Sequence, residues 1–575
     1  MDPQILQTAQ AWANEPAFDA AFKAEIKALI DAGDEKELTD RFYKDLEFGT
    51  GGLRGILGAG SNRMNIYTVR RANQGLADYL AQAGIRNASV VIAYDCRRMS
   101  DQFSRESASV LAANGIKVYL FDSLRPTPML SFAVRHLKAT AGIVVTASHN
   151  PPEYNGYKVS WDDGCQVTAP HDQGIIDRVN GITDWSSLKT LDFDQAVKEG
   201  KIEIIGEGVD EAYYRRVMEL SLGDVKDYKD FGVVYTPLHG AGNLPVREAL
   251  KRAGFERVTV VPSQELPDGE FPTVAYPNPE EGAAMEEAVK TAGPEDQLIL
   301  ATDPDADRIG AMVRQNGEWL RLNGNQIGQL LLDFYLEALV TAGKLPQSGH
   351  YITTIVTSTL GAKIAQAKGL KTHEVLTGFK YIGAVMAELE TQPGETYVFG
   401  TEESHGYLFG DFVRDKDAVS ACMIFAEMAA TLKAQGKTVM VRLDELHQQF
   451  GYHSDELLTQ TYKGKEGAEQ IQKILLHFRK QPPQEIGGVA LNEIRDYQNQ
   501  VVLDAQGKTK GQLDLPKSNV LAFLLADGSR ITLRPSGTEP KVKFYFNLTG
   551  KDAQGLDAQK ERYVRDITEQ IAHIN

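Results

Sequence analysis

The sequence contains few cysteines and no long apolar run. Its 575 residues include three cysteines, far apart and without Cys-x-x-Cys spacing, which excludes a disulfide framework and a structural zinc site. No run of about 18 apolar residues occurs, so we expect no transmembrane helix. Charged residues interrupt the N-terminal segment, which therefore has no secretory apolar core. Together with the cysteine content, this predicts a cytoplasmic protein.

Acidic residues outnumber basic ones, with 78 Asp and Glu against 61 Lys and Arg, so the formal net charge is -17. An excess of acidic residues argues against nucleic acid or an anionic membrane as the partner, although it does not exclude a small anionic substrate. Three common motifs are missing as well. Arg54 stands where a dinucleotide fingerprint needs its third glycine, both Gly-Lys-Thr segments lack the leading Walker glycine, and no Gly-x-Ser-x-Gly surrounds Ser148. These absences disfavour dehydrogenases, P-loop enzymes and α/β-hydrolases.

The chain is long enough for three to five domains, and its apolar pattern suggests four. Residues 1–46 have helical periodicity, and short apolar runs then alternate with helical segments. The predicted strands cover residues 90–93, 118–121, 143–145, 232–235, 258–261, 298–300, 352–356 and 397–399. Strands separated by helices predict α/β domains with mixed or parallel sheets.

The C-terminal part has a different pattern. Three apolar runs follow closely, and Asp527 and Gly528 between the first two indicate a hairpin. We expect an antiparallel sheet covered by a helix over residues 552–573, hence a fourth domain of α+β type. The predicted domains are 1–208, 209–325, 326–452 and 453–575, each with one polar loop of interest.

The first polar loop follows the strand at 143–145 and reads TASHNP over residues 146–151, here named the serine loop. In open α/β sheets, ligands bind at loops beyond the carboxyl ends of the strands. Ser148 is therefore a candidate nucleophile. A serine that carried a phosphoryl group would be nearly a dianion and could also be a metal ligand.

The second polar loop follows the strand at 298–300 and places aspartates at alternate positions, Asp303, Asp305 and Asp307. Three carboxylates at this spacing can converge on one hard cation, and ligand sets made only of oxygen suit Mg²⁺ better than zinc. We predict one Mg²⁺ per chain here, next to Ser148. Arg308 could add positive charge around a phosphate.

Two further loops offer groups that suit a phosphorylated sugar. Glu402, Glu403 and Ser404 could hydrogen-bond sugar hydroxyls, although acidic residues also favour a helix N-terminus. The loop at residues 534–538 combines a guanidinium, two hydroxyls and a glycine, which together can hold a phosphate. Its predicted ligands are Arg534, Ser536, Gly537 and Thr538, with Lys541 adding charge at longer range.

These four loops, in this order, resemble those of the α-D-phosphohexomutase superfamily, which comprises phosphoglucomutases and phosphomannomutases. The resemblance covers nearly the whole chain. Its length and the glycine-rich turn at residues 49–55 after an N-terminal helical segment are similar to the long, phosphopentomutase-like subgroup. The resemblance implies four domains around a central cleft, each contributing one loop.

The resemblance also implies a mechanism: a phosphorylated Ser148 transfers its phosphoryl group to a sugar monophosphate, and the other phosphoryl of the bisphosphate returns to the serine. It implies a catalytic role for Lys158 and a role in reading sugar orientation for Lys380, and we add Arg54 to the catalytic residues. His405 is a further acid–base candidate. A sugar bisphosphate such as glucose 1,6-bisphosphate is the implied activator.

The prediction is thus a phosphosugar mutase that interconverts 1- and 6-phosphates, with glucose preferred and the protein a monomer or homodimer. The loop at residues 401–405, here named the sugar loop, reads Thr-Glu-Glu-Ser-His and departs from both common family patterns. This departure leaves mannose and pentose phosphates open as substrates. A metal-dependent phosphohydrolase, in which water accepts the phosphoryl group, is the alternative of a different class. Lys158 could also merely pair with Asp162 or Asp163.

Overall fold

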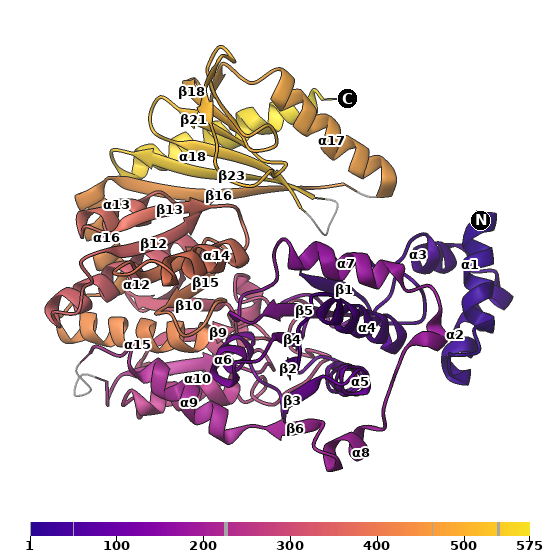
Figure 1. Cartoon of the computed structure of the whole chain (residues 1–575). Helices are drawn as coiled ribbons and strands as arrows, with labels where there is room; N and C mark the ends of the chain where they lie inside the picture. Colours follow the sequence, from indigo (N-terminus) through magenta and orange to yellow (C-terminus); the bar gives the residue numbers. More distant parts are fainter. Residues whose placement is uncertain (1, 50, 224–227, 463, 537–540, 575) are drawn as a thin grey trace. The chain divides into compact units, whose positions relative to one another are not determined.

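The computed structural model describes residues 2–49, 51–223, 228–462, 464–536 and 541–574, which form two compact units (Figure 1). The first unit comprises Met1–Leu322, Gly383–Pro393 and His405–Gln435, and the second comprises Asn323–Ile382, Gly394–Ser404 and Gly436–Asn575. Within the described residues, no helix combines the length and the apolar character needed to cross a bilayer.

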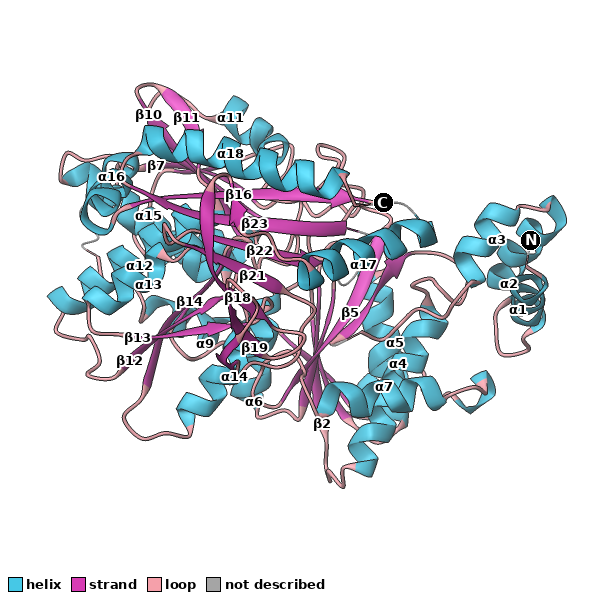
Figure 2. Cartoon of the chain, turned by 90° about the horizontal axis from the view of Figure 1, so that it is seen from above, coloured by secondary structure: helices cyan, strands magenta, loops and turns pink. Residues whose placement is uncertain are grey.

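Three short helices open the first unit: α1 (Pro3–Asn14), α2 (Ala20–Ala32) and α3 (Glu35–Phe42) (Figure 2). Asp19 caps the start of α2, and Gly33, with φ of 61°, ends it, because glycine adopts the left-handed conformation without steric cost. An aromatic cluster joins these helices to the domain that follows. Phe18 contacts Trp12, and its ring centroid lies 4.1 Å from that of Tyr67 on α4 (Ile66–Gln82).

The first sheet has the strand order β1-β5-β4-β2-β3-β6. Its strands are β1 (Gly52–Ile56), β2 (Ser89–Tyr94), β3 (Lys117–Phe121), β4 (Ala141–Val145), β5 (Tyr154–Trp161) and β6 (Ile202–Ile205). The helices of this domain, besides α4, are α5 (Ser100–Ala113), α6 (Thr127–Leu137), α7 (His171–Gly181) and α8 (Phe193–Lys198). Strands β2, β3, β4 and β6 run parallel, whereas β5 returns antiparallel beside β4. The serine loop is therefore the connection between a parallel strand and its antiparallel neighbour.

The second sheet repeats this plan in the order β11-β10-β9-β7-β8. Its elements are β7 (Gly232–Thr236), β8 (Val258–Val260), β9 (Asp296–Thr302), β10 (Ile309–Gln315) and β11 (Glu318–Arg321), with α9 (Glu207–Met218), α10 (Asn243–Arg252) and α11 (Glu286–Thr291). Strands β7, β8 and β9 are parallel, and β10 returns antiparallel to β9. The first unit also contains β15 (Gly406–Phe409) and α15 (Ala418–Ala434), a helix buried on nearly all sides that packs against α10 and β9.

The third sheet has the strand order β13-β12-β14-β15, and the second unit contains its first three strands. Strand β12 (Gly349–Thr354) lies between β13 (Lys371–Val375) and β14 (Thr396–Glu402), parallel to both. Helices α12 (Gly324–Thr341), α13 (Leu360–Ala367) and α16 (Val439–Phe450) accompany it, and α14 (Phe379–Glu390) links β13 to β14 in sequence. Three domains thus share one βαβαβ topology, with the third strand beside the first and the second on the other side: β4-β2-β3, β9-β7-β8 and β14-β12-β13.

The fourth sheet is antiparallel, as predicted, with the order β16-β23-β22-β21-β18-β19-β20 and β17 paired to β18. Its strands are β16 (Tyr452–Thr461), β17 (Glu485–Ile486), β18 (Val489–Asp496), β19 (Val501–Asp504), β20 (Thr509–Gln512), β21 (Leu521–Leu525), β22 (Arg530–Pro535) and β23 (Lys541–Gly550). Helices α17 (Gly464–Lys480) and α18 (Ala553–Ala572) share one apolar core with these strands. The predicted fold class, three α/β domains and one antiparallel α+β domain, is confirmed.

Candidate active site

Ser148 lies close after β4, and its hydroxyl faces the loop of the second domain that carries Asp303, Asp305 and Asp307. The side chain is buried, and its Oγ donates to Asp303 Oδ2 at 2.6 Å. Ser148 has φ of 52°, a left-handed conformation that residues other than glycine adopt at some cost and that concentrates at functional sites. Its backbone N–H donates to Thr146 Oγ1 at 2.8 Å, which fixes the turn. The local backbone therefore directs the serine oxygen at a carboxylate.

The three aspartates converge because their loop is a tight connection between the antiparallel strands β9 and β10. The backbone N–H groups of Asp307 and Arg308 donate to Asp303 Oδ1 at 3.1 and 3.0 Å, and Ala306 has φ of 48°. One carboxylate oxygen from each aspartate lies within 4.8 Å of the others, and all three side chains are buried. Thr127, at the start of α6, donates to Asp305 Oδ2 at 2.9 Å.

Charge repulsion in this cluster shifts the pKa values of the aspartates. Burial and the charges of Asp305 and Asp307 raise the pKa of Asp303 well above the ordinary aspartate value, and burial and Asp305 raise that of Asp307. Burial also acts to raise the pKa of Asp305, but the Lys158 ammonium and hydrogen bonds outweigh it, so the pKa of Asp305 lies below its ordinary value. Three buried carboxyl groups this close repel one another, and a cation bound between them would relieve that repulsion.

The cluster fits a hard divalent cation. Asp305 Oδ1 and Asp307 Oδ1 are buried and accept no hydrogen bond, although a carboxylate oxygen in such a place normally has a partner. Oxygen donors of this kind are the ligands of Mg²⁺ and Ca²⁺ rather than of zinc. Among the described residues, this is the single group of three or more His, Cys, Asp or Glu side chains with such a geometry.

Lys158 lies beside these carboxylates on β5. Its Nζ is 3.0 Å from Asp305 Oδ2 and 3.9 Å from Asp307 Oδ2, so its observed partners are these aspartates rather than Asp162 or Asp163. Strand β1 can approach β5 closely because residue 52 is glycine: a Cβ there would lie 1.8 Å from the Tyr157 carbonyl oxygen. Gly52 is paired with Lys158 in the register.

Arg54 follows two residues later on β1 and is paired with Gly156. It therefore shares a sheet face with Lys158, since side chains two residues apart on a strand point the same way. Burial lowers the pKa of Arg54, and the charges of Asp305 and Asp307 oppose this shift.

Lys416 is a second lysine of this site, and the sequence did not reveal it. Its Nζ lies 3.1 Å from Asp307 Oδ2, and its side chain is largely buried. Gly406 leaves the room for it, because a Cβ there would lie 2.1 Å from Lys416 Cδ. The sequence signal is only a short charged run before the apolar helix α15, and such runs are usually solvated surfaces. The partner, Asp307, is remote along the chain.

A second layer of charge surrounds Arg308. Its Nη1 donates to Glu280 Oε1, and its Nε is 3.7 Å from Asp307 Oδ1. Burial opposes ionisation of Glu280, but Arg308, His405 and His149 lower its pKa to about 2. His405 is buried, and its Nδ1 contacts the Ile309 carbonyl at 2.8 Å. Because a carbonyl can only accept, this nitrogen carries the proton and Nε2 is left as the acceptor in the neutral ring.

The second unit contains residues 401–404 of the sugar loop and the loop at residues 534–538, which is predicted to bind a phosphate. Glu402 ends β14, and its Oε1 accepts from the Gly378 N–H at 2.7 Å, which ties it to the turn that precedes Lys380. Glu403 Oε2 accepts from the hydroxyls of Thr354 and Thr357 at 3.2 and 3.1 Å. Burial raises the pKa of Glu403, although the charge of Arg534 opposes the shift.

The structure describes some, but not all, of the other residues of this unit that are predicted to bind the substrate. Ser404 is half-buried after β14, and Lys380 Nζ lies 5.2 Å from the ring centroid of Tyr381. The Ser536 N–H donates to the Lys541 carbonyl at 2.8 Å, which closes the loop after β22. Gly537 and Thr538 lie outside the described residues.

Comparison with known proteins identifies the family. Models of the phosphoglucomutase/phosphomannomutase domains match in order: alpha/beta/alpha domain I at residues 45–185, domain II at 211–317, domain III at 323–450 and the C-terminal domain at 486–564. The chain belongs to the phosphoglucomutase/phosphomannomutase family. The predicted relationship to the α-D-phosphohexomutase superfamily is confirmed, whereas the phosphopentomutase-like subgroup stays a prediction.

Family members of similar length include phosphoglucomutases from staphylococci. The one from Staphylococcus haemolyticus (strain JCSC1435) is 37% identical over 530 residues, which cover 92% of this chain and 95% of the relative. The one from Staphylococcus aureus (strain MRSA252) is 38% identical over 542 residues, covering 93% and 95%.

Two solved structures of the family share the fold. The open form of the Paramecium phosphoglucomutase pp63/parafusin has a TM-score of 0.68 at 19% identity and covers 92% of this chain and 95% of its own. A phosphoglucomutase/phosphomannomutase family protein from Burkholderia thailandensis has a TM-score of 0.64 at 20% identity, covering 92% and 98%.

Within this family framework, the structure brings together Ser148, Lys158 and the three aspartates in the first unit. Arg54 and Arg308 lie around the same carboxylates. The catalytic, metal-binding and substrate-binding roles of all these residues stay predictions, as do the domain boundaries.

Proposed function

We propose that this chain interconverts glucose 1-phosphate and glucose 6-phosphate through a phosphorylated Ser148 and glucose 1,6-bisphosphate. The observation that carries the proposal is the contact of Ser148 Oγ with Asp303 Oδ2 at 2.6 Å, inside a cluster of three buried aspartates flanked by two lysines. The relatives that cover more than nine tenths of the chain and are named phosphoglucomutase support glucose as the sugar.

The phosphoryl transfer makes one bond and breaks one. A hydroxyl oxygen of the sugar monophosphate forms a bond to the phosphorus carried by Ser148, the Ser148 O–P bond breaks, and the hydroxyl proton passes to a base. We assign this base to Lys158, whose Nζ is 3.0 Å from Asp305 Oδ2 and which accepts the proton in its neutral amine form. Return of the other phosphoryl group to Ser148 reverses these steps and releases the isomerised monophosphate.

Asp303, Asp305 and Asp307 would hold Mg²⁺, with the Ser148 phosphate as a further ligand. When bound, the cation supplies charge stabilisation to the phosphoryl oxygens during transfer. The basic side chains around the aspartates, Lys158, Lys416 and Arg308, would keep the phosphoryl group in place by the same electrostatic effect.

The loops of the second unit would bind the part of the substrate that does not react. Glu402 and Ser404 offer hydrogen bonds to sugar hydroxyls, and Lys380 follows the turn to which Glu402 is tied. Arg534 can clamp the second phosphate through parallel hydrogen bonds, with Ser536, Gly537, Thr538 and Lys541 completing the loop. The chain has three cysteines without Cys-x-x-Cys spacing, which supports a reducing cytoplasmic setting.

The test is a coupled assay of the purified protein on glucose, mannose and ribose 1-phosphates, with and without the corresponding bisphosphate, and with Ser148→Ala as the matched control. We expect turnover of glucose 1-phosphate that Ser148→Ala lacks and that the bisphosphate stimulates. A higher rate on mannose or ribose phosphate would overturn the assignment of the sugar. Release of inorganic phosphate without isomerisation would favour phosphohydrolase activity and contradict the proposed mutase activity.

A further inference from the structure

The guanidinium of Arg97 is fully buried beneath the serine loop and donates to its backbone. Arg97 Nη2 donates to the Ser148 carbonyl at 2.6 Å and to the Asn150 carbonyl, and Nη1 donates to the carbonyls of Pro151 at 2.9 Å and Tyr154 at 3.1 Å. One side chain therefore satisfies four backbone acceptors between the candidate nucleophile and the start of β5.

Asp95, at the end of β2, holds the other side of the same turn. Its Oδ2 lies 3.4 Å from Arg97 Nε and accepts from Thr146 Oγ1 at 2.6 Å. The Thr146 hydroxyl has one proton, which it gives to Asp95, so its oxygen is free to accept the Ser148 N–H at 2.8 Å. Both backbone polar groups of Ser148, its N–H and its carbonyl, are thus fixed by this one ion pair.

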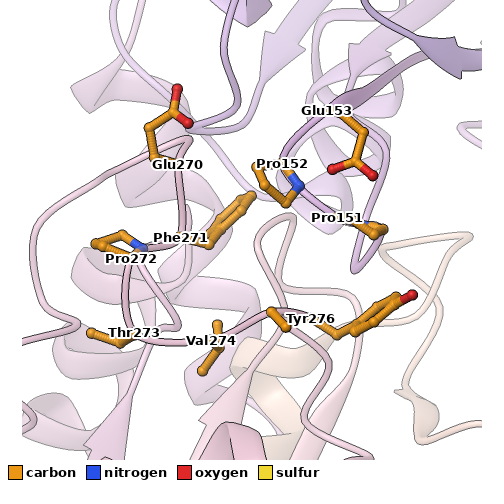
Figure 3. Close-up of a pocket in the computed structure, with 10 residues that line it drawn as sticks. Pro151, Pro152, Glu153, Glu270, Phe271, Pro272, Thr273, Val274 and Tyr276 are labelled. Carbon is orange, nitrogen blue, oxygen red and sulfur yellow. The ribbon is translucent and has the colours of Figure 1, made fainter.

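A loop of the second domain closes over the guanidinium. The ring of Phe271 lies 5.0 Å from Arg97 Cζ, a cation–π distance, and its side chain is buried. Figure 3 shows Phe271 directed towards Pro152 across a pocket that has Pro151–Glu153 on one wall and Glu270–Tyr276 on the other. Gly269 permits the close approach, since a Cβ there would lie 2.5 Å from the Arg98 backbone nitrogen.

A stability role alone explains this arrangement poorly. Replacing a buried ion pair with apolar side chains is often neutral or stabilising, because both charges lose their hydration. Ser148 has the left-handed backbone conformation, which persists only where its surroundings over-determine it. The buried pair supplies that constraint at the residue that must present its oxygen to a phosphoryl acceptor.

We propose that Arg97, held by Asp95 and covered by Phe271, is a positioning residue that keeps Ser148 in its left-handed conformation with Oγ facing the aspartates. Arg97 acts through the backbone of the serine loop and touches no reacting atom. The catalytic consequence rests on the proposed mutase function, whereas the conformational consequence does not.

The test compares Arg97→Lys, which keeps the charge but cannot reach four carbonyls with one ammonium, with Arg98→Lys. Arg98 is the matched control, because its side chain is 42% exposed and donates to the Pro152 carbonyl, at 2.9 and 3.3 Å, which Arg97 does not bind. We expect Arg97→Lys to lower kcat by about 100-fold, the cost of a nucleophile displaced by roughly 1 Å, and to leave KM within about threefold. Arg98→Lys should keep both constants.

Hydrogen exchange at the Ser148 amide gives a readout that needs no mutase activity. Arg97→Lys should accelerate it by at least about tenfold, while amides of the neighbouring helix α5 keep their wild-type rates. Unchanged Ser148 exchange, or equal acceleration throughout α5, overturns the positioning role. A wild-type protein without mutase activity overturns the proposed function alone, since the exchange result stands by itself.

If Arg97→Lys does not fold, Phe271→Leu tests the same idea with a similar apolar volume. This variant removes the aromatic face from the guanidinium. It should raise the exchange rate of the Ser148 amide and lower kcat, and each change should be smaller than the change expected for Arg97→Lys. Wild-type values for both would overturn the proposal.

Discussion

Glu427, a buried carboxyl on α15, should make the first unit less stable as the pH rises. Burial raises its pKa from 4.5 to about 7, although the Ser221 hydroxyl and the Leu222 backbone donate to it and oppose the shift. The folded protein therefore holds a proton on Glu427 at pH values where the unfolded chain has lost it. Stability linked to this proton is fully present below pH 4.5 and is lost as the pH rises through about 7.

The magnitude follows from the two pKa values. A tenfold change in an ionisation constant is worth about 1.4 kcal/mol, so the whole loss is about 3 kcal/mol. Most of this loss, about 2 to 3 kcal/mol, falls between pH 5 and pH 8, which is on the order of a 100-fold change in the opening equilibrium of the region around α15.

Native-state hydrogen exchange of the α15 amides measures this change. Protection factors of the wild type should fall between pH 5 and pH 8 by on the order of 100-fold more than those of Glu427→Gln, which cannot titrate. Glu219→Gln, at an exposed glutamate of the same unit, controls for the loss of one charge and should behave like the wild type. Equal falls in the wild type and Glu427→Gln would refute the reasoning.

Four further predictions concern the proposed function. Intact-mass measurement should show a species about 80 Da heavier that maps to the peptide of Ser148, as one phosphate requires, and Ser148→Ala should lack it. Asp305→Asn should weaken Mg²⁺ binding in calorimetry while circular dichroism stays the same, and full activity after exhaustive chelation would contradict the metal role. Lys158→Met and Lys416→Met should each lose turnover without a lower melting temperature, whereas equal losses of both would indicate structural lysines. Arg534→Ala should raise KM strongly and lower kcat, because remote binding energy helps to position the reacting end; if both constants are unchanged, the loop has another role.

The fold was predictable where strands are buried on both faces. The runs that became β2, β4 and β9 are continuously apolar and end in polar loops, so their type and position could be read directly. The antiparallel fourth sheet was predictable from the closely spaced strands and the Asp527–Gly528 turn. Helix α15 gave no amphipathic signal, because core surrounds it on nearly all sides.

The site was predictable loop by loop but not as a network. Ser148 and the three aspartates stand out because each loop follows a buried strand. The contact of Lys416 with Asp307, and the four carbonyls that accept from Arg97, depend on which elements the fold brings side by side. Tertiary pairing of residues far apart in sequence leaves no local periodicity from which it could be read.

The shared βαβαβ topology makes the chain modular. In each of three copies the loop of interest leaves the third strand: Ser148 follows β4, Asp303 follows β9, and Glu402 ends β14. Each loop is anchored by the strands of its own copy, so altering one leaves the strand pairing of the other two intact. Under the proposed function, phosphoryl transfer and sugar choice would then be separable traits. If the proposed roles hold, exchanging the segment after β14 should change the substrate, while Arg97, Asp95 and Asp303 keep their contacts with the serine loop.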